Sequence, residues 1–228
     1  TLTFLDPACG SGNFLTETYL SLRRLENEIL QELQGGQMVL GYDNMNPIQV
    51  SISQFYGIEI NDFAVTVAKT ALWIAESQMM KETESIVLMH LDFLPLKTNA
   101  FIHEGNALQV DWESVIPKYQ LSYIMGNPPF VARAGRTKAK DSSSKGMLDD
   151  TQKTDRLNVF GEDLGNVDYV ACWFKKAAVF TKNTAIRCAF VATDSICQGQ
   201  QIYPIWKNIL QDDIYILSLI HISEPTRH

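Results

Sequence analysis

The sequence predicts an α/β fold, a mostly parallel sheet with helices on both faces. Short apolar segments typical of strands alternate with longer segments whose apolar residues recur at helical spacing. Strands that alternate with helices pair in parallel, because each helix returns the chain across a face of the sheet. Glycine and polar residues follow directly after several strands, which is where ligands bind in such folds.

The chain begins with a strand and a helix. Residues 1–6 form the predicted buried strand, and a Gly-x-Gly turn follows it. The helix begins at Asn13, and "QGGQ" ends it. Its apolar residues at helical spacing are Leu15, Tyr19, Leu22, Leu25, Ile29 and Leu33. A polar loop is predicted over 35–53.

Three more strands and a second helix follow. "QFYGIEI" at 54–60 is the next strand, and Asp62 can cap the helix after it. The predicted buried stripe of that helix is Val65, Ala68, Leu72, Ala75 and Met79. Short strands are predicted at 101–104 and 121–125.

The second half is less regular. Residues 131–165 are polar without a clear period, so we expect no regular structure there and a functional or disordered segment. We predict a helix at 167–180, a buried strand at 185–193, a helix at 200–210 and a strand at 214–219. The residues of the first of these helices that we expect to face inward are Val170, Trp173, Phe174, Ala177 and Phe180.

Length and a hydrophobic content of 46% suit one well-buried domain. We expect 1–219 to form this domain, with a polar insertion over 131–165, and both of its ends to be cut. Residues 220–228 break the preceding pattern and resemble translated sequencing-adapter read-through, so we expect them not to be native.

Composition limits the classes of function. The net charge is −7, so a nucleic acid would have to bind a local basic patch. No apolar run reaches the roughly 18 residues of a membrane span. The cysteines lie far apart without a Cys-x-x-Cys pair, which predicts no zinc site and free thiols in a reducing cytoplasm. They are Cys9, Cys172, Cys188 and Cys197.

The first strand ends in "DPACGSGNF", residues 6–14. Gly10 and Gly12 would let a ligand approach the backbone closely. The third glycine of a dinucleotide fingerprint is absent, because position 15 is Leu, and so is a phosphate-binding lysine. A cofactor loop and a plain structural turn both fit this pattern.

The second and third strands also end in candidate ligand-binding residues. Glu59 could accept both hydroxyls of a ribose, and Ile60 could cover an adenine face. Asn106 could meet the polar edge of the adenine. The alternatives are a solvated strand-end acid for Glu59 and an ordinary Gly-Asn turn for Asn106.

The fourth strand ends in "GNPPF". The Asn127 amide oxygen and the Pro128 carbonyl are two acceptors held rigidly by proline, which suits an amino group with two hydrogens. Phe130 offers a face on which a flat ring could stack. The alternative is a strand-ending turn with Phe130 in the core.

Taken in order, these motifs resemble those of class I S-adenosylmethionine-dependent DNA adenine methyltransferases of the amino type. The methyltransferase segment of fused, type IIG-like restriction-modification enzymes is the more similar group. That resemblance also rests on "QFYGIEINDFAVTVAKTALWIAE", "DYVACWFKKAA" and "TDSICQGQQIYPIWK". It covers nearly all of 2–212 and implies the Rossmann-like class I methyltransferase fold.

The resemblance implies a role for each matching residue. The methionine part of S-adenosylmethionine would lie beside Asp6, Ala8 and Gly10. Its ribose and adenine would contact Glu59, Ile60 and Asn106. This sequence departs from the family at Asn106, where Asp is commoner, and at Asp194, where Asn is expected.

The resemblance also implies double-stranded DNA as substrate. An adenine flipped from the duplex would be held by Asn127, Pro128, Pro129 and Phe130. A cluster of basic residues in the following loop could contact DNA phosphates, or it could be a solvated surface. These residues are Arg133, Arg136, Lys138 and Lys140.

Two other functions stay open. The same acceptors suit an amino group in RNA or a glutamine side-chain amide, although the glutamine enzymes usually have Tyr where Phe130 stands. A cofactor-binding subunit without turnover is the other alternative. No metal is required, and we expect target-recognition and any nuclease regions to lie in missing parts of the parent chain.

Overall fold

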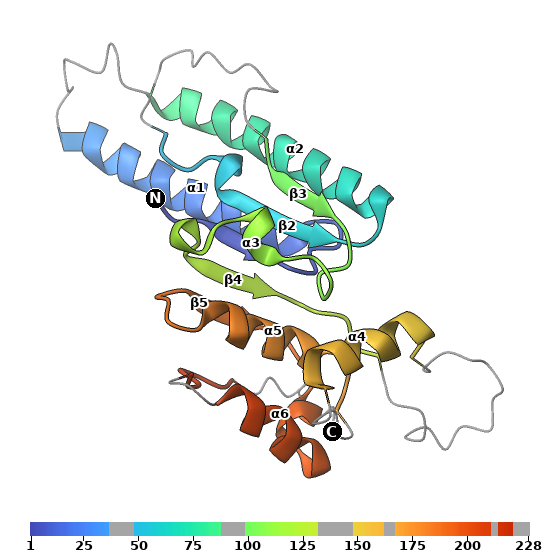
Figure 1. Ribbon diagram of the computed structural model, residues 1–228. Coiled ribbons are helices and arrows are strands. Elements are labelled where there is room, and N and C mark those ends of the chain that lie inside the picture. The colour runs from blue at the N-terminus through green and yellow to red at the C-terminus, as the bar shows by residue number, and fades with distance from the viewer. Residues whose placement is uncertain (37–47, 88–98, 132–147, 162–166, 211–213, 221–228) are drawn as a thin grey trace, which may run out of the picture. The chain divides into compact units, whose positions relative to one another are not determined.

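The sheet has five strands in the order β3-β2-β1-β4-β5 (Figure 1). The pairs β1–β2, β1–β4 and β2–β3 are parallel, which confirms the predicted α/β class. The computed structural model describes residues 1–36, 48–87, 99–131, 148–161, 167–210 and 214–220. The chain divides into unit 1, Thr1–Asn127 with Ala185–Ala189, and unit 2, Pro128–Thr184 with Phe190–His228.

The central strands of unit 1 are in register through an aromatic row. Phe4 is paired with both Phe55 and Tyr123 on the flanking strands. Its ring stacks on theirs, with centroids 5.1 Å and 5.5 Å away. The strands are β1 (Phe4–Asp6), β2 (Phe55–Glu59), β3 (Phe101–Glu104), β4 (Tyr123–Gly126) and β5 (Arg187–Phe190). This register brings the carboxyl ends of the first four strands to one edge.

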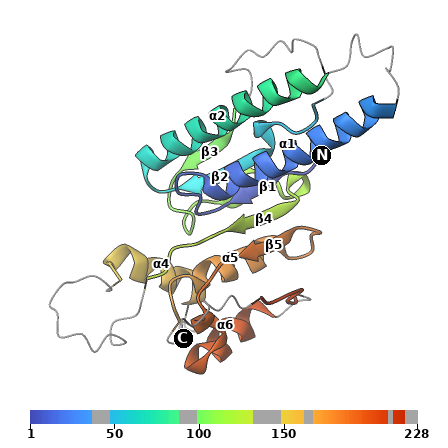
Figure 2. The same ribbon diagram turned by 180° about the vertical axis from the view of Figure 1, so that it is seen from behind.

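Helices α1 (Asn13–Gly36) and α2 (Asp62–Val87) pack on each other and on the same strands, in front of the sheet in Figure 2. Every residue of the predicted buried stripe of α2 is buried. Together with Leu15 and Tyr19 of α1, this stripe forms the core against the sheet. The apolar period of α2 therefore predicted both the helix and its buried face.

The second half of α1 differs from its apolar pattern. Leu25, Ile29 and Leu33 are about half exposed, at 53%, 50% and 55%. The buried positions are Leu30 and two polar residues, Arg23 and Asn27. The fully buried Arg23 donates to Thr83 of α2 at 2.7 Å and also pairs with Glu26. Hydrophobic spacing predicted the helix but could not identify a buried face that contains an arginine, whose two terminal nitrogens are hydrogen-bonded and whose buried Nε has no partner among the described residues.

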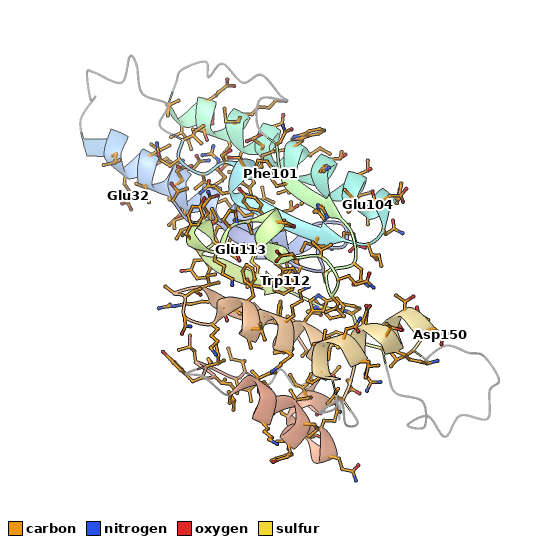
Figure 3. All side chains as sticks on the ribbon, in the orientation of Figure 1. Glu32, Phe101, Glu104, Trp112, Glu113 and Asp150 are labelled. Atoms are coloured by element: carbon orange, nitrogen blue, oxygen red, sulfur yellow. The ribbon has the colours of Figure 1, made fainter. Side chains whose placement is uncertain are left out.

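The connection between β3 and β4 includes the short helix α3 (Trp112–Val115). The Trp112 ring is fully buried, and its indole N–H donates to the Ala107 carbonyl at 2.8 Å (Figure 3). This bond satisfies the ring's polar atom and fixes the turn that carries Asn106.

Unit 2 contains a helix that the sequence did not predict. Residues 131–165 were expected to lack regular structure, but α4 spans Asp150–Phe160. A capping box holds its start, in which Asp149 and Gln152 bond each other's backbone N–H groups. Only Asp155 and Phe160 of α4 are buried, so the helix has no apolar stripe to reveal it.

The other helices of unit 2 are α5 (Ala171–Thr181) and α6 (Ile202–Ile209), close to the predicted ranges. Phe174 of α5 packs edge-on against Trp206 of α6 and against Phe190. The inward-facing prediction for α5 is largely confirmed, with Phe174 partly rather than fully buried.

One strand prediction was wrong, and another was right about the strand but wrong about its burial. The strand predicted at 185–193 exists as β5, but it is largely exposed, because it is the edge of the described sheet and one of its sides has no strand neighbour. Residues 214–219 form no strand. Apolar content was read as burial in both cases, although an edge strand can stay exposed and a strand needs a hydrogen-bonding neighbour. Of the predicted tail 220–228, only Ile220 is described.

Candidate functional site

The site residues predicted from the first four strands lie in unit 1, as far as Asn127. Asp6, Glu59 and Glu104 are the last residues of β1, β2 and β3, and Asn127 directly follows β4. Glu104 marks this carboxyl edge in Figure 3. We call it the strand-end edge.

The turn after β1 has the conformation that its glycines allow. Gly10 and Gly12 have φ values of 54° and 83°, in the left-handed region. The Gly12 N–H donates to the Cys9 carbonyl at 2.8 Å, and its Cα lies against Ala68 of α2. Beside Gly10, in contrast, a Cβ would meet nothing within 4 Å. The turn therefore packs on the helix at Gly12 and is open at Gly10.

Glu59 joins the ends of three strands. Its carboxylate accepts the Gly10 N–H at 3.0 Å and the Asn61 N–H at 2.9 Å, one on each oxygen. Its backbone carbonyl accepts the Gly105 N–H after β3 at 2.8 Å. A carboxylate has about four acceptor positions, so two remain for further donors. Glu59 is thus more than a solvated strand-end acid, because backbone donors fix its orientation.

Asp6 is a buried carboxylate with few groups nearby that stabilise its negative charge. It is 1% exposed, and among the described residues its one hydrogen bond comes from the Ala8 N–H at 3.0 Å. Burial raises the pKa of Asp6 to about 7, the Ala8 bond lowers it, and the Glu59 charge raises it further. The side chain would gain from a cation or from additional donors.

Gly126 brings β4 against this carboxylate. A Cβ added at Gly126 would lie 3.0 Å from Cγ of Asp6 and nearer still to Oδ1. Asn127, the next residue, is exposed. The start of "NPPF" is therefore one residue from a direct contact with the buried acid of β1.

Ile60 and Asn106, the other residues predicted to contact the adenine, lie at the ends of the second and third strands. Ile60 is 66% exposed beside Glu59. The Asn106 side-chain oxygen accepts the Leu108 N–H at 2.9 Å, which is the turn geometry that the alternative interpretation expected. The role of Asn106 toward an adenine remains a prediction.

The rest of the target-base motif belongs to unit 2. Pro128 is buried and Pro129 is exposed. Phe130 is 45% exposed, so the alternative in which its ring lies in the core is wrong. The basic residues Arg133, Arg136, Lys138 and Lys140 fall outside the described residues.

Sequence reasoning missed three residues of the strand-end edge. Asn61 donates to Glu59 and caps α2 through its side chain, which accepts the Ala64 N–H at 3.0 Å. Phe63, in the first turn of α2, is 73% exposed and follows the exposed Ile60 by three residues. Gly126 is the third. An Asn before a helix start is a recognisable cap, and an aromatic residue there is unusual, but no local pattern explains Gly126.

The edge lacks the features of a metal centre. Among the described residues, no three His, Cys, Asp or Glu side chains could hold a metal ion together. Within the same ranges, no helix is long and apolar enough to cross a membrane.

Comparison with known proteins agrees with this architecture. The family model "MmeI, DNA-methyltransferase domain" matches residues 1–221. The chain belongs to the MmeI DNA-methyltransferase domain family. The resemblance found from the ordered motifs is thereby confirmed at the level of family and fold.

Individual proteins are similar to most of the length of this MmeI-type domain. The chain is 39% identical over 220 residues to DNA methyltransferase A of Bacillus subtilis (strain 168), covering 94% of this chain and 23% of that protein. It is 42% identical, with a TM-score of 0.79, to the Type IIL restriction-modification enzyme MmeI in complex with DNA, covering 92% of this chain and 27% of that one. The DrdV–DNA complex shares the fold at 16% identity and a TM-score of 0.54. The chain thus spans about a quarter of the length of these first two relatives.

Proposed function

We propose that this MmeI-type domain transfers a methyl group from S-adenosylmethionine to the exocyclic 6-amino group of adenine in double-stranded DNA. It would act as the modification part of a restriction-modification protein. The observation that carries the proposal is the position of Asn127, exposed and one residue beyond the contact between Gly126 and the buried Asp6.

The residues of the strand-end edge fit the cofactor. Asp6 has a raised pKa and one described donor, so an ammonium group would stabilise its charged form. Glu59 is held by two backbone N–H groups and keeps acceptor capacity for two ribose hydroxyls. Ile60 and Phe63 offer exposed apolar surface for an adenine ring.

The cofactor, when bound, would supply a methyl group that its sulfonium already activates. The protein then needs to position a nucleophile and has little covalent chemistry to do. The adenine amine is a poor nucleophile, because its lone pair is delocalised into the ring. The Asn127 side-chain oxygen and the Pro128 carbonyl would accept its two hydrogens and favour the tetrahedral nitrogen. By analogy with oxyanion-hole donors, such fixed acceptors would contribute on the order of 3 kcal/mol.

Recognition of the base requires that it leave the duplex. An adenine inside double-stranded DNA cannot reach acceptors at a strand end, so it would be flipped out and stacked on the exposed Phe130 ring. Because the net charge is −7, phosphate binding needs a local basic patch, and we propose that Arg133, Arg136 and Lys138 form it.

The test is a methylation assay with the full-length protein that contains this chain. It is incubated with duplex DNA and methyl-labelled S-adenosylmethionine, and the DNA is digested to nucleosides. We expect label in N6-methyladenine, and a loss of at least about 100-fold with Asn127→Ala. Label in cytosine, no label in DNA, or an undiminished rate with Asn127→Ala would refute the proposal.

The same assay separates the alternatives. If tRNA or a glutamine-containing protein is supplied in place of DNA and becomes labelled, the result favours these other amino-group substrates. Binding of labelled cofactor without transfer to any of the three would favour a non-catalytic subunit. The four free cysteines fit the proposed reducing, cytoplasmic location, and target-recognition and nuclease regions are proposed for other parts of the full-length protein.

A further inference from the structure

Gly126 is buried, and the backbone conformation at this position does not require a glycine. The described glycines with positive φ are Gly10, Gly12, Gly161 and Gly199. Gly126 is a regular residue of β4, where any side chain could adopt the backbone angles. A glycine in a strand also costs stability, on the order of 0.5–1 kcal/mol relative to Ala. Its presence here therefore needs a reason in space.

That reason is the Asp6 side chain. A Cβ at Gly126 would overlap Oδ1 and lie 3.0 Å from Cγ. Asp6 is short and 1% exposed, and the same Oδ1 accepts the Ala8 N–H at 3.0 Å, so the carboxylate has little freedom to move aside. At Gly57 the two nearest atoms are the ends of the Cys9 and Ile102 side chains, which can rotate, and Cβ of Cys9 is further away, at 3.2 Å. The two glycines therefore differ in what a methyl group would displace.

We propose that Gly126 is a positioning residue, which lets the Asp6 carboxylate rest directly on the β4 backbone and so fixes Asn127 relative to the cofactor side of the site. This rests on the proposed function. Asp6 is the acid that would face the methyl donor, and Asn127 is the amide that would hold the target amine. One contact between β1 and β4, at residues 120 positions apart in sequence, then sets the separation of the two reactants.

The consequence is a specific effect of Gly126→Ala. The added methyl group would push Asp6 away from Ala8 or push β4 away from β1. The first displacement weakens cofactor binding, and the second moves Asn127. We expect the dissociation constant for S-adenosylmethionine to rise at least about tenfold and kcat at saturating substrates to fall at least about tenfold, because misplacement by about 1 Å can cost 100-fold in rate.

The matched control is Ile124→Val, which removes one buried methylene from the same strand. It should lower Tm, as loss of core packing does, but leave cofactor affinity and kcat within twofold. Asn127→Ala should lower kcat and leave cofactor affinity within twofold. A positioning role predicts that, of these three variants, only Gly126→Ala loses both cofactor affinity and kcat. General destabilisation of β4 does not predict this pattern.

A double-mutant cycle on Tm tests the contact without any assay of activity. Gly126→Ala should lower Tm in the wild-type background and much less in an Asp6→Ala background, where the obstructing carboxylate is gone. If Gly126→Ala does not fold, the Asp6→Ala/Gly126→Ala variant should fold.

Additive changes in Tm, failure of the double variant to fold while Asp6→Ala folds, or full cofactor affinity and turnover in Gly126→Ala would each overturn the proposal. A wild-type protein that methylates no adenine contradicts the proposed function itself and with it the positioning role, and this is seen before any variant is compared. The Tm cycle still decides in that case whether the contact exists.

Discussion

Asp6 in unit 1 and Asp168 in unit 2 are both acids that precede a helix, but their surroundings are opposite. One oxygen of Asp168 accepts the Ser195 hydroxyl at 2.8 Å and the Gln201 amide at 2.9 Å. The Asp168 N–H donates back to Gln201 at 2.9 Å. Asp6 accepts one backbone N–H among the described residues and has the Glu59 charge nearby.

The difference separates an acid held by side-chain donors from an acid whose charge the described residues do not compensate. Asp168 ties three stretches of unit 2 together with side-chain donors, including the buried Ser195 and Gln201. Asp6 is more deeply buried, and burial raises its pKa, so the folded protein alone does not stabilise its charge. Burial of an under-compensated carboxylate is typical of a functional site.

The largest expected contrast comes from removing each charge. Asp6→Asn should weaken binding of S-adenosylmethionine by about 100-fold, since a buried charged partner is lost. The full shift in the pKa of Asp6 represents roughly 4 kcal/mol of unfolding free energy. The same change should recover about half of this, about 2 kcal/mol, and so stabilise the free protein at pH 8. Asp168→Asn should instead destabilise the protein by about 1–3 kcal/mol and leave cofactor affinity unchanged. Calorimetric binding and urea unfolding measure the two quantities.

The contribution of Asp6 to the stability of the folded protein should change with pH in one direction. The ordinary pKa of an aspartate side chain is 3.8 and that of Asp6 in the folded protein is about 7, so the folded state keeps a proton that the unfolded state releases between these values. The stability contributed by this group is therefore present below pH 4 and is lost as the pH rises to 7. Asp6→Asn should match the wild type at pH 4 and exceed it at pH 8. Equal stability of the two proteins at pH 8 would argue against a raised pKa.

A smaller effect is expected from Glu59→Gln. One of the two backbone N–H groups of Gly10 and Asn61 would then face an amide N–H, so the turn after β1 would lose a charge-assisted bond. We expect cofactor affinity to fall about tenfold, corresponding to about 1.4 kcal/mol. Glu104→Gln is the matched control, because Glu104 is an exposed acid at the end of the neighbouring strand. Comparable losses in the two variants would mean that Glu59 acts only through overall charge.

The smallest effect is expected at the apolar surface. Ile60→Ala should reduce cofactor affinity about fivefold, through loss of about 1 kcal/mol of apolar contact. Tm should stay the same, since Ile60 is 66% exposed in the free protein. Ile74→Ala, at an exposed isoleucine further along α2, should change neither quantity. If Ile60→Ala lowers Tm without changing affinity, the side chain is structural and does not cover the adenine.

The sequence was sufficient to predict the first four strands and most residues of the strand-end edge, because each of these strands ends in a local change from apolar residues to Gly, Asn or Pro. Asp6, Glu59 and Asn127 could be found in this way. The contact between Asp6 and Gly126 could not, since it depends on which strands pair and in which register. The buried Arg23 and the helix α4 were missed for a related reason: specific polar bonds stabilise them, and these leave no apolar period in the sequence.

The most direct test of the account is the proton released when S-adenosylmethionine binds. Asp6 is mostly protonated at pH 6 in the free protein, and a cationic ligand beside it would lower its pKa. Titration calorimetry at pH 6, in buffers of different ionisation enthalpy, should show more protons released by the wild type than by Asp6→Asn. Asp168→Asn should behave as the wild type. Equal release by wild type and Asp6→Asn would contradict the claim that the buried acid of the strand-end edge receives the methyl donor.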